Sequence, residues 1–261
     1  MDSTIDTEWL GLEQRAPGEW SFELRPALTR FDGKFYGGTG IAVATALLEA
    51  GTRRSALWAT VQFVGSADVG DRIDCVVEEL ARGRRTSQVR ITASVGDRVM
   101  LVALGAAGYA RPDVLPTQFG AMPDVPPPSE LPAWRPNVPF PIDFDKPSWL
   151  STAEIREVRL PDGGHGLWGR MRDRRQTRAT LGFLADMVPS GVARAAGRAG
   201  GGTSLDNSMR FGELPDTEWI LVEFDPYLIV SGYAHGAGRV WSEDGTLLGV
   251  ASQTASMIFF D

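Results

Sequence analysis

The sequence predicts an α+β fold in which two tandem antiparallel sheets are each wrapped on one long helix. Three observations lead to this prediction: an internal repeat, the same order of helix and strands in both copies, and a proline-rich segment between them. The chain has 261 residues, of which 43% are hydrophobic. That length is sufficient for each copy to bury a core of its own.

A constant shift of 148 residues relates the two halves of the chain. It lays residues 96–103, GDRVMLVA, over residues 244–251, DGTLLGVA, and each stretch is a turn followed by an apolar strand. It also lays GGTGIAVATALLEAG, residues 37–51, over ADMVPSGVARAAGRA, residues 185–199, and both stretches are typical of a helix. One shift that matches separate features indicates a duplicated domain.

Proline marks the boundary between the copies. Eleven of the 17 prolines lie in residues 111–147, where neither a helix nor a central strand can run. We therefore expect an N-terminal domain over 1–110, a linker over 111–150 and a C-terminal domain over 151–261. Four aromatic side chains of this segment predict that the linker lies against a surface of the protein: Phe119, Trp134, Phe140 and Phe144.

Each half has a helix that is followed by four strands. In the first half we expect the strands at 56–65, 72–81, 86–95 and 98–108, and in the second at 204–213, 218–227, 233–242 and 246–260. Apolar residues alternate from Val89 to Val95, as on a strand with one buried face. Short turns such as VGDR and EDGT connect antiparallel strands, and Asp244-Gly245 predicts a type I′ turn.

Composition excludes several classes of partner. The net charge of −7 disfavours nucleic acid, and no stretch has the roughly 20 apolar residues that span a membrane. The N-terminus, MDSTIDTEWLGLE, lacks the apolar core of a signal peptide. Cys75 is the single cysteine, and His165 and His235 are the two histidines. We expect a cytoplasmic protein that binds neither nucleic acid nor a membrane and that has no metal or other cofactor.

The two halves differ in polarity at aligned positions. At the shift of 148, four polar residues of the second half meet apolar or small residues of the first: Asp186 meets Gly38, Ser204 meets Ala56, Asp206 meets Trp58, and Gln253 meets Gly105. The first half forms its strands without these polar side chains, so the fold does not require them. This asymmetry predicts an active site in the second half.

Several motifs in fixed order resemble the thioesterase II-like acyl-CoA thioesterases, whose fold is a double hot-dog. They are LGFLADMVPSG, SLDNSMRF and DGTLLGVASQ in the second half, and the run from Val76 to Gly105 in the first. In that family an aspartate opens the second helix, a Thr or Ser precedes Leu/Ile-Asp, and a glutamine lies on the last strand. The resemblance covers most of the chain except the linker.

The resemblance implies catalytic roles for three residues. Asp186 would orient and polarise a water for attack on the thioester carbonyl, with Ser204 bonding the same water and Gln253 beside them. Gln253 stands two residues nearer to Val-Ala-Ser than in the family's bacterial enzymes, a slip that preserves the face of the strand. Without the resemblance, Asp186 reads equally as a helix cap and Ser204 as a loop serine.

Five further residues are expected to bind substrate. Backbone N–H groups at the start of the first helix, at Gly37, Gly38 and Thr39, would hold the carbonyl oxygen, although these glycines also suit close packing. Asn207 stands where the family has histidine, and Arg210 precedes Phe211 where the family has Trp-Phe. Arg210 is expected near the cleft, where it would pair with Asp186, Asp206 or an anionic group of the ligand.

The predicted function is hydrolysis of a fatty or related acyl-CoA, by a protein that forms homo-oligomers. The alternative is a non-catalytic acyl-CoA or lipid-binding protein on the same fold, which Asn207 in place of the family histidine would suit. A Ser-His-Asp hydrolase lacks its G-x-S-x-G motif, and GGTGIAVA lacks the βαβ context of a dinucleotide site. A hot-dog hydratase would need an Asp-x-x-x-x-His pair, which the sequence does not contain at either histidine.

Overall fold

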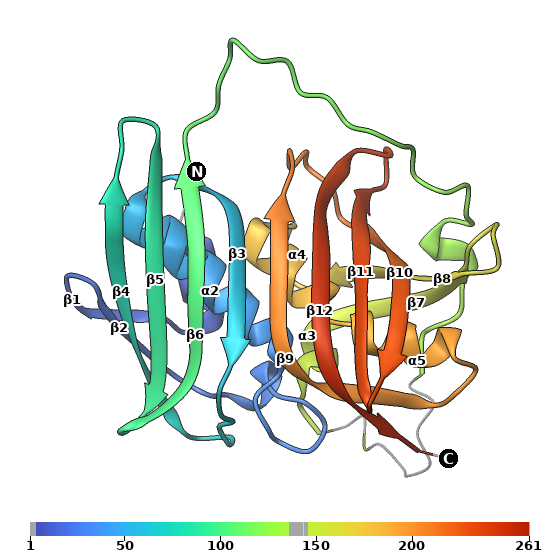
Figure 1. The fold of residues 1–261 in the computed structure, drawn as a ribbon, viewed down its shortest axis with the longest axis horizontal. Helices are drawn as coiled ribbons and strands as arrows, with labels where there is room; N and C mark the ends of the chain where they lie inside the picture. The colour runs from blue at the N-terminus through green and yellow to red at the C-terminus, as the bar shows by residue number, and fades with distance from the viewer. Residues whose placement is uncertain (1–3, 136–142, 144–145, 261) are drawn as a thin grey trace.

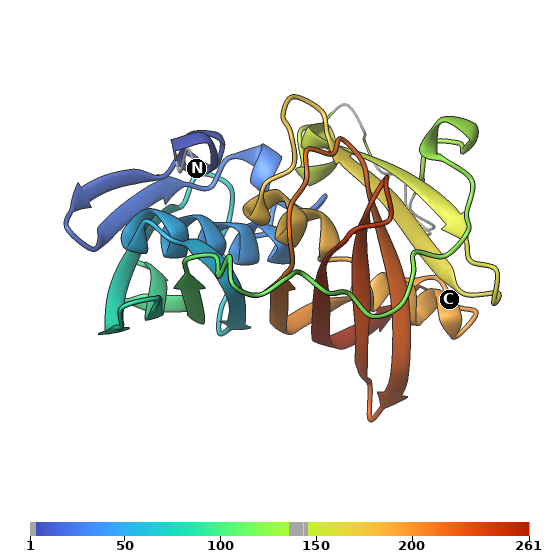
Figure 2. The same cartoon turned by 90° about the horizontal axis from the view of Figure 1, so that it is seen from above.

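One large antiparallel sheet forms the body of the protein, and its helices cover one face (Figures 1 and 2). The structure is a computed structural model that describes residues 4–135, 143 and 146–260. Within that part of the chain, twelve strands pair in the order β1-β2-β4-β5-β6-β3-β9-β12-β11-β10-β8-β7. The α+β double hot-dog prediction is confirmed, with the two predicted sheets joined into one where β3 pairs with β9.

The elements of the first half occupy residues 4–108. They are α1 (Thr4–Leu10), β1 (Glu13–Ala16), β2 (Glu19–Glu23), η1 (Pro26–Leu28), α2 (Gly37–Thr52), β3 (Ser55–Phe63), β4 (Arg72–Arg82), β5 (Thr86–Val95) and β6 (Arg98–Gly108). The helix α2 is buried on nearly all sides because the sheet curls around it, and it is correspondingly apolar all round.

The second half repeats this arrangement with two helices in place of one. Its elements are α3 (Trp149–Thr152), β7 (Ala153–Arg159), β8 (His165–Met171), α4 (Arg178–Ala185), α5 (Val188–Ala195), β9 (Gly200–Phe211), β10 (Ile220–Val230), β11 (Tyr233–Ser242) and β12 (Leu247–Phe259). The helix predicted over residues 185–199 is present as the shorter α5, with Pro189 in its first turn, whereas α4, which ends just before Asp186, was not predicted.

All eight predicted strands are present, as β3–β6 and β9–β12. Four further strands, β1, β2, β7 and β8, were not predicted, and they extend the two ends of the sheet. The predicted type I′ turn is also wrong, because Gly245 has a φ of 83° but Asp244 is not among the residues with positive φ. A type I′ turn requires positive φ at both central residues.

The repeat is visible in the pairing of β3 with β9, which joins the halves at the centre of Figure 1. Thr60 lies opposite Ser208, and their hydroxyl oxygens are 2.9 Å apart. These two residues are separated by 148 positions, so the local two-fold axis that relates the halves passes between them. The shift of 148 found in the sequence is therefore the structural repeat of the protein.

The linker lies against the second half, as predicted, through Trp134 and through polar and backbone contacts of other residues. Gln118 bonds the turn between β11 and β12, with Nε2 donating to Gly245 O at 3.1 Å. Trp168 Nε1 donates to Pro126 O at 3.0 Å. Trp134 packs against the core, whereas Phe119 is 86% exposed, and Phe140 and Phe144 lie outside the described residues. The domain boundaries at 110 and 150 remain a prediction, because the halves share one sheet.

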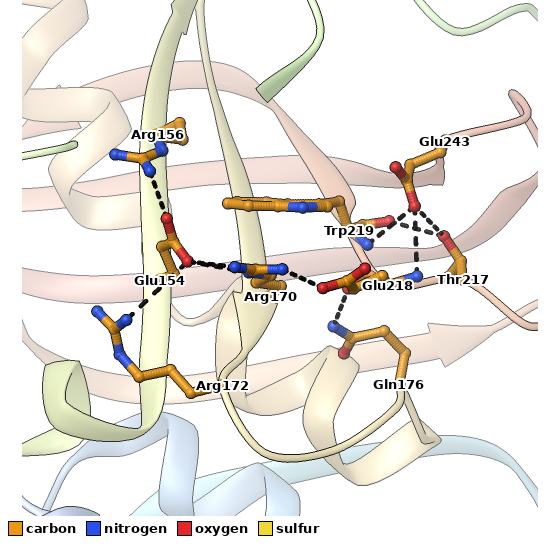
Figure 3. A network of polar contacts seen from close by, with 9 residues as sticks. All are labelled: Glu154, Arg156, Arg170, Arg172, Gln176, Thr217, Glu218, Trp219 and Glu243. Carbon is orange, nitrogen blue, oxygen red and sulfur yellow. Dashed lines mark hydrogen bonds and ion pairs between the residues drawn. The ribbon is translucent and has the colours of Figure 1, made fainter. Parts of the chain in front are cut away.

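A polar network fastens the β7–β8 hairpin to the loop before β10 (Figure 3). Arg170 forms ion pairs with Glu154, where Nη2 lies 2.8 Å from Oε2, and with Glu218. Its guanidinium carbon also lies 4.8 Å from the centre of the Trp219 ring. Gln176 Nε2 donates to Glu218 O at 2.8 Å, so the network extends to the segment that leads into α4.

In the described part of the chain, no helix is long and apolar enough to cross a membrane.

Candidate active site

Asp186 lies at the break between α4 and α5, with its side chain buried under the sheet. Its carboxylate does not cap α5, since that helix is preceded by Met187, which makes no side-chain cap. Oδ1 instead accepts hydrogen bonds from Asn207 Nδ2, at 2.8 Å, and from Gln253 Nε2. The aspartate is therefore held by two adjacent strands, β9 and β12.

A β-bulge turns Ser204 toward this aspartate. Where β9 pairs with β12, Asn207 lies opposite Gln253 and Ser204 lies opposite Ala255. Leu205 is an extra residue of β9, between Ser204 and Asp206, and has no partner on β12. Without the bulge, Ser204 and Asn207 would point to opposite faces, because they are three positions apart. With it, Ser204 lies on the inner face, and Gln253 Nε2 is 2.8 Å from Ser204 Oγ. The structure thus brings Asp186, Ser204 and Gln253 into one hydrogen-bonded group.

Burial changes the acid–base behaviour of Asp186. Loss of hydration raises the pKa of its carboxyl to about 7, while hydrogen bonds from Asn207, Gln253 and the Gly38 backbone oppose that rise. A carboxyl with such a pKa is partly ionised near neutral pH. It can take a proton from a water and return it within one reaction cycle, which is the requirement for a general base.

The start of α2, from the first half, lies directly against Asp186. A Cβ at Gly37 would lie 2.6 Å from Asp186 Oδ2, and a Cβ at Gly38 would lie 2.5 Å from Phe183 O. Only glycine permits these approaches. Tyr36 completes the contact, because its hydroxyl donates to Phe183 O at 3.1 Å. The first half therefore contributes a helix N-terminus to the site, while the second contributes the polar side chains.

Two of the predicted substrate-binding residues make other contacts. The backbone N–H of Thr39, the group that was predicted to hold the carbonyl oxygen, donates to Tyr36 O at 3.0 Å, and the buried hydroxyl donates to Leu28 O at 2.8 Å. Arg210 is exposed on the outer face of the sheet, opposite Trp58. Asp206 points the same way, and its Oδ1 accepts a hydrogen bond from Thr254 N at 2.7 Å. The structure does not bring Arg210 to Asp186, because their side chains lie on opposite faces of the sheet.

A cavity of about 670 Å³ opens beside this group. Its lining includes aromatic side chains from both halves: Phe31, Phe35, Tyr36, Phe63, Trp134, Trp149, Phe224 and Phe260. The cavity also runs along α5 and the residues that flank it, where the polar lining residues are four positions apart: Asp186, Ser190, Arg194 and Arg198. At the shift of 148, the same positions of α2 are Gly38, Ala42, Ala46 and Ala50. The difference in polarity between the halves extends along the whole helix face.

Sequence reasoning missed the polar cluster at the far end of α5. Arg194 Nε donates to Glu157 Oε1 at 2.7 Å, and His165 Nδ1 lies 3.6 Å from the same oxygen. Burial and the nearby Arg159 and Arg194 lower the pKa of His165, which favours the neutral imidazole. The four-residue spacing from Asp186 to Arg198 is the sequence signal that could have found Arg194.

Gln253 leaves one buried atom without a partner. Its Oε1 has no hydrogen bond with any residue that the structure describes, although the side chain is almost fully buried. A buried acceptor without a donor costs about 1–3 kcal/mol.

The chain matches two family models, the acyl-CoA thioesterase N-terminal domain over residues 25–108 and the C-terminal domain over 116–257. Among solved structures, a thioesterase candidate from Novosphingobium aromaticivorans DSM 12444 is 26% identical, with a TM-score of 0.85, over 94% of this chain and 97% of that one. Two others show the fold alone. A hot-dog protein of unknown function from Alicyclobacillus acidocaldarius has 22% identity, a TM-score of 0.83 and coverage of 97% and 98%. The acyl-CoA thioesterase II TesB2 of Mycobacterium marinum has 19% identity, a TM-score of 0.76 and coverage of 97% and 98%. No curated protein matches the chain.

Proposed function

The chain belongs to the acyl-CoA thioesterase family, a family of thioester hydrolases, and on this premise we propose that Asp186, Ser204 and Gln253 hold the water that hydrolyses a fatty or related acyl-CoA. The observation that carries the proposal is the hydrogen-bonded group itself. Gln253 Nε2 bonds both the Asp186 carboxylate and Ser204 Oγ, and both of those residues line the cavity.

The reaction requires a base, a positioned water and a donor for the developing oxyanion. Asp186 takes a proton from the water as its oxygen attacks the acyl carbon, and Ser204 and Gln253 fix the direction of attack. When the carbon–sulfur bond breaks, the protonated Asp186 returns its proton to the leaving thiolate. No covalent bond to Ser204 is needed, so the serine acts only through its hydrogen bond.

The start of α2 supplies the oxyanion donor in this proposal. The first N–H groups of a helix have no partner within the helix and carry partial positive charge. The Gly38 N–H is directed to Asp186, and the Thr39 N–H donates to Tyr36 O at 3.0 Å. Gly37 lines the cavity, and its N–H is the one that we assign to the carbonyl oxygen.

The lining of the cavity suggests how the substrate lies. Apolar acyl groups bury favourably against aromatic rings, so the acyl chain is assigned to the side with Phe35, Phe63 and Trp149. The polar coenzyme portion is then assigned to the side with Ser190 and Arg194. A cytoplasmic location also belongs to the proposal and rests on the single buried thiol of Cys75.

Thiol release from a panel of acyl-CoAs tests the proposal. Hydrolysis frees coenzyme A, which a thiol-reactive dye detects as each thioester is cleaved. A protein that only binds acyl-CoA would show a higher melting temperature with ligand but no thiol release. That result, across short, long and aromatic acyl groups, would favour the non-catalytic alternative.

A further inference from the structure

The hairpin of β10 and β11 ends in an apolar tip, residues 227–233, that projects beyond the rest of the sheet (Figure 2). Five of its side chains are between 37% and 60% exposed: Tyr227, Leu228, Ile229, Val230 and Tyr233. Single exposed apolar residues are common on protein surfaces, but a continuous run on one projecting element is typical of an interaction site.

The first half provides an internal comparison for this tip. Its hairpin of β4 and β5 has a bulge at Leu80, as the second hairpin has at Tyr227. Counting from these bulges, the two tips align at a shift of 147, and the first contains Arg82, Arg84 and Arg85. The same hairpin therefore forms with a charged tip, and its fold does not require the apolar residues of the second.

The backbone of this hairpin is also open along one edge. Strand β8 pairs with β10 only over Ile220–Glu223. From Phe224 to Val230, β10 has β11 on one side and no strand of the described chain on the other. Open edges of this kind pair with other strands unless charge or proline blocks them, and Asp225 and Pro226 are the only such residues here.

We propose that the β10–β11 tip joins two copies of this chain, with residues 224–230 pairing antiparallel to the same strand of the second copy. Antiparallel pairing about a two-fold axis satisfies both open edges at once, as it does where β3 meets β9 within the chain. An anionic lipid surface suits the tip poorly, because residues 220–238 contain no Lys or Arg and the net charge is −7.

Light scattering over a dilution series tests the proposal with the variant Leu228→Lys/Val230→Lys. Wild-type protein is expected to be a dimer, and the double variant to self-associate at least about 100-fold more weakly, since lysines replace two apolar residues of the paired segment. The control is Leu80→Lys, which is 56% exposed on the corresponding hairpin and should leave the dimer unchanged. Thioester hydrolysis should be the same in all three proteins, which shows that they are folded.

Amide hydrogen exchange tests the strand pairing itself, because exchange at residues 224–230 should be slower in the dimer than in dilute monomer. The proposal is overturned by a wild type that stays monomeric, by a double variant with unchanged association, or by equal weakening in Leu80→Lys. Monomeric wild type that binds phosphatidylcholine vesicles, with loss of binding in the double variant, would assign the tip to a lipid surface instead.

Discussion

The strand pair β3–β6 in the first half and the pair β9–β12 in the second have the same register, residue for residue. Ala56 lies opposite Ala107 and Trp58 opposite Ala106, with Leu57 bulged between them. Adding 148 to each number gives the pairing and the bulge of the second half. The backbone pairing of these strands is therefore the same in both halves, and the halves differ here in the side chains that the strands carry.

The comparison shows that the bulge also forms where no polar side chain makes use of it. In the first half, the bulge turns Ala56 inward to fill space beside the helix, and Ala56 is 1% exposed. In the second half, the same bulge turns a hydroxyl toward a buried carboxylate. The site thus rests on a feature that the fold forms in both copies, and only its polar residues are particular to one.

The largest expected effects are at the starts of α5 and α2, and they differ in kind. Asp186→Asn should lower kcat by about 10²-fold or more, because the amide cannot take a proton from water. At the aligned position, Gly38→Ala should instead destabilise the protein by about 1–3 kcal/mol or more, since a Cβ there would overlap Tyr36 and Phe183 O. Thiol release and chemical denaturation measure the two effects, and full activity in Asp186→Asn would remove Asp186 from the mechanism.

The pH dependence of stability should follow the same aspartate. The pKa of Asp186 in the folded protein, about 7, lies above its ordinary value of 3.8. Its protonated form therefore stabilises the fold at low pH, and this contribution is lost as the pH rises through about 7. Asp186→Asn should lack this loss. The free energy of unfolding of the variant, relative to that of the wild type, should therefore be higher at pH 8 than at pH 4 by roughly 2–4 kcal/mol.

Denaturant titrations at several pH values measure this difference. Burial also raises the pKa of Asp6 and Glu49, but both carboxyls are present in wild type and variant and therefore cancel. The rate of hydrolysis by the wild type should rise with pH through the same region, because the base must be ionised. Parallel stability curves for the two proteins would contradict the assignment.

The sequence predicted the repeat and the eight central strands, because each depends on local pattern or on aligned positions. The expectation that Asp186, Ser204 and Gln253 lie together came from the resemblance and from the unlike polarity of the aligned positions. The sequence did not predict α4, because the eight residues of that helix are too few to show a clear helical period. The contact of Gly37 with Asp186 joins residues that are far apart in the chain, and no local signal reports such a distance. Arg210 lies three positions from Asn207 on β9 and therefore on the opposite face of the sheet, away from Asp186.

An intermediate effect is expected at Ser204. Ser204→Ala should slow hydrolysis by about 10- to 100-fold, equal to about 1–3 kcal/mol, because the water loses one hydrogen bond. Ser204→Thr should keep most of the activity, since it retains the hydroxyl. The matched change in the other half, Ala56→Ser, should leave the rate unchanged and affect stability only, because Ala56 is buried away from the cavity.

A serine-directed phosphonate distinguishes this role from that of a nucleophile. If Ser204 attacked the thioester itself, the reagent would add its mass to the protein at Ser204, and Ser204→Ala would be inactive. An unlabelled protein with graded loss in Ser204→Ala supports the role of holding a water. Adduct formation at that residue would refute it.

The smallest effect on activity is expected from substitutions on the outer face of β9. Arg210 is exposed, lies opposite Trp58 and is absent from the cavity lining, so Arg210→Ala should change kcat/KM by less than about twofold and stability by about 0.5 kcal/mol or less. Asn207→Ala, three residues earlier on the inner face, is the matched control, because its amide bonds Asp186. That variant should raise the pKa of Asp186 and move the pH–rate profile to higher pH, since a hydrogen bond that favours the ionised carboxylate is lost. Steady-state kinetics over a pH series measure both variants. A raised KM for acyl-CoA in Arg210→Ala, with an unchanged profile in Asn207→Ala, would mean that the outer face of β9 binds the ligand and that the division between the faces is wrong.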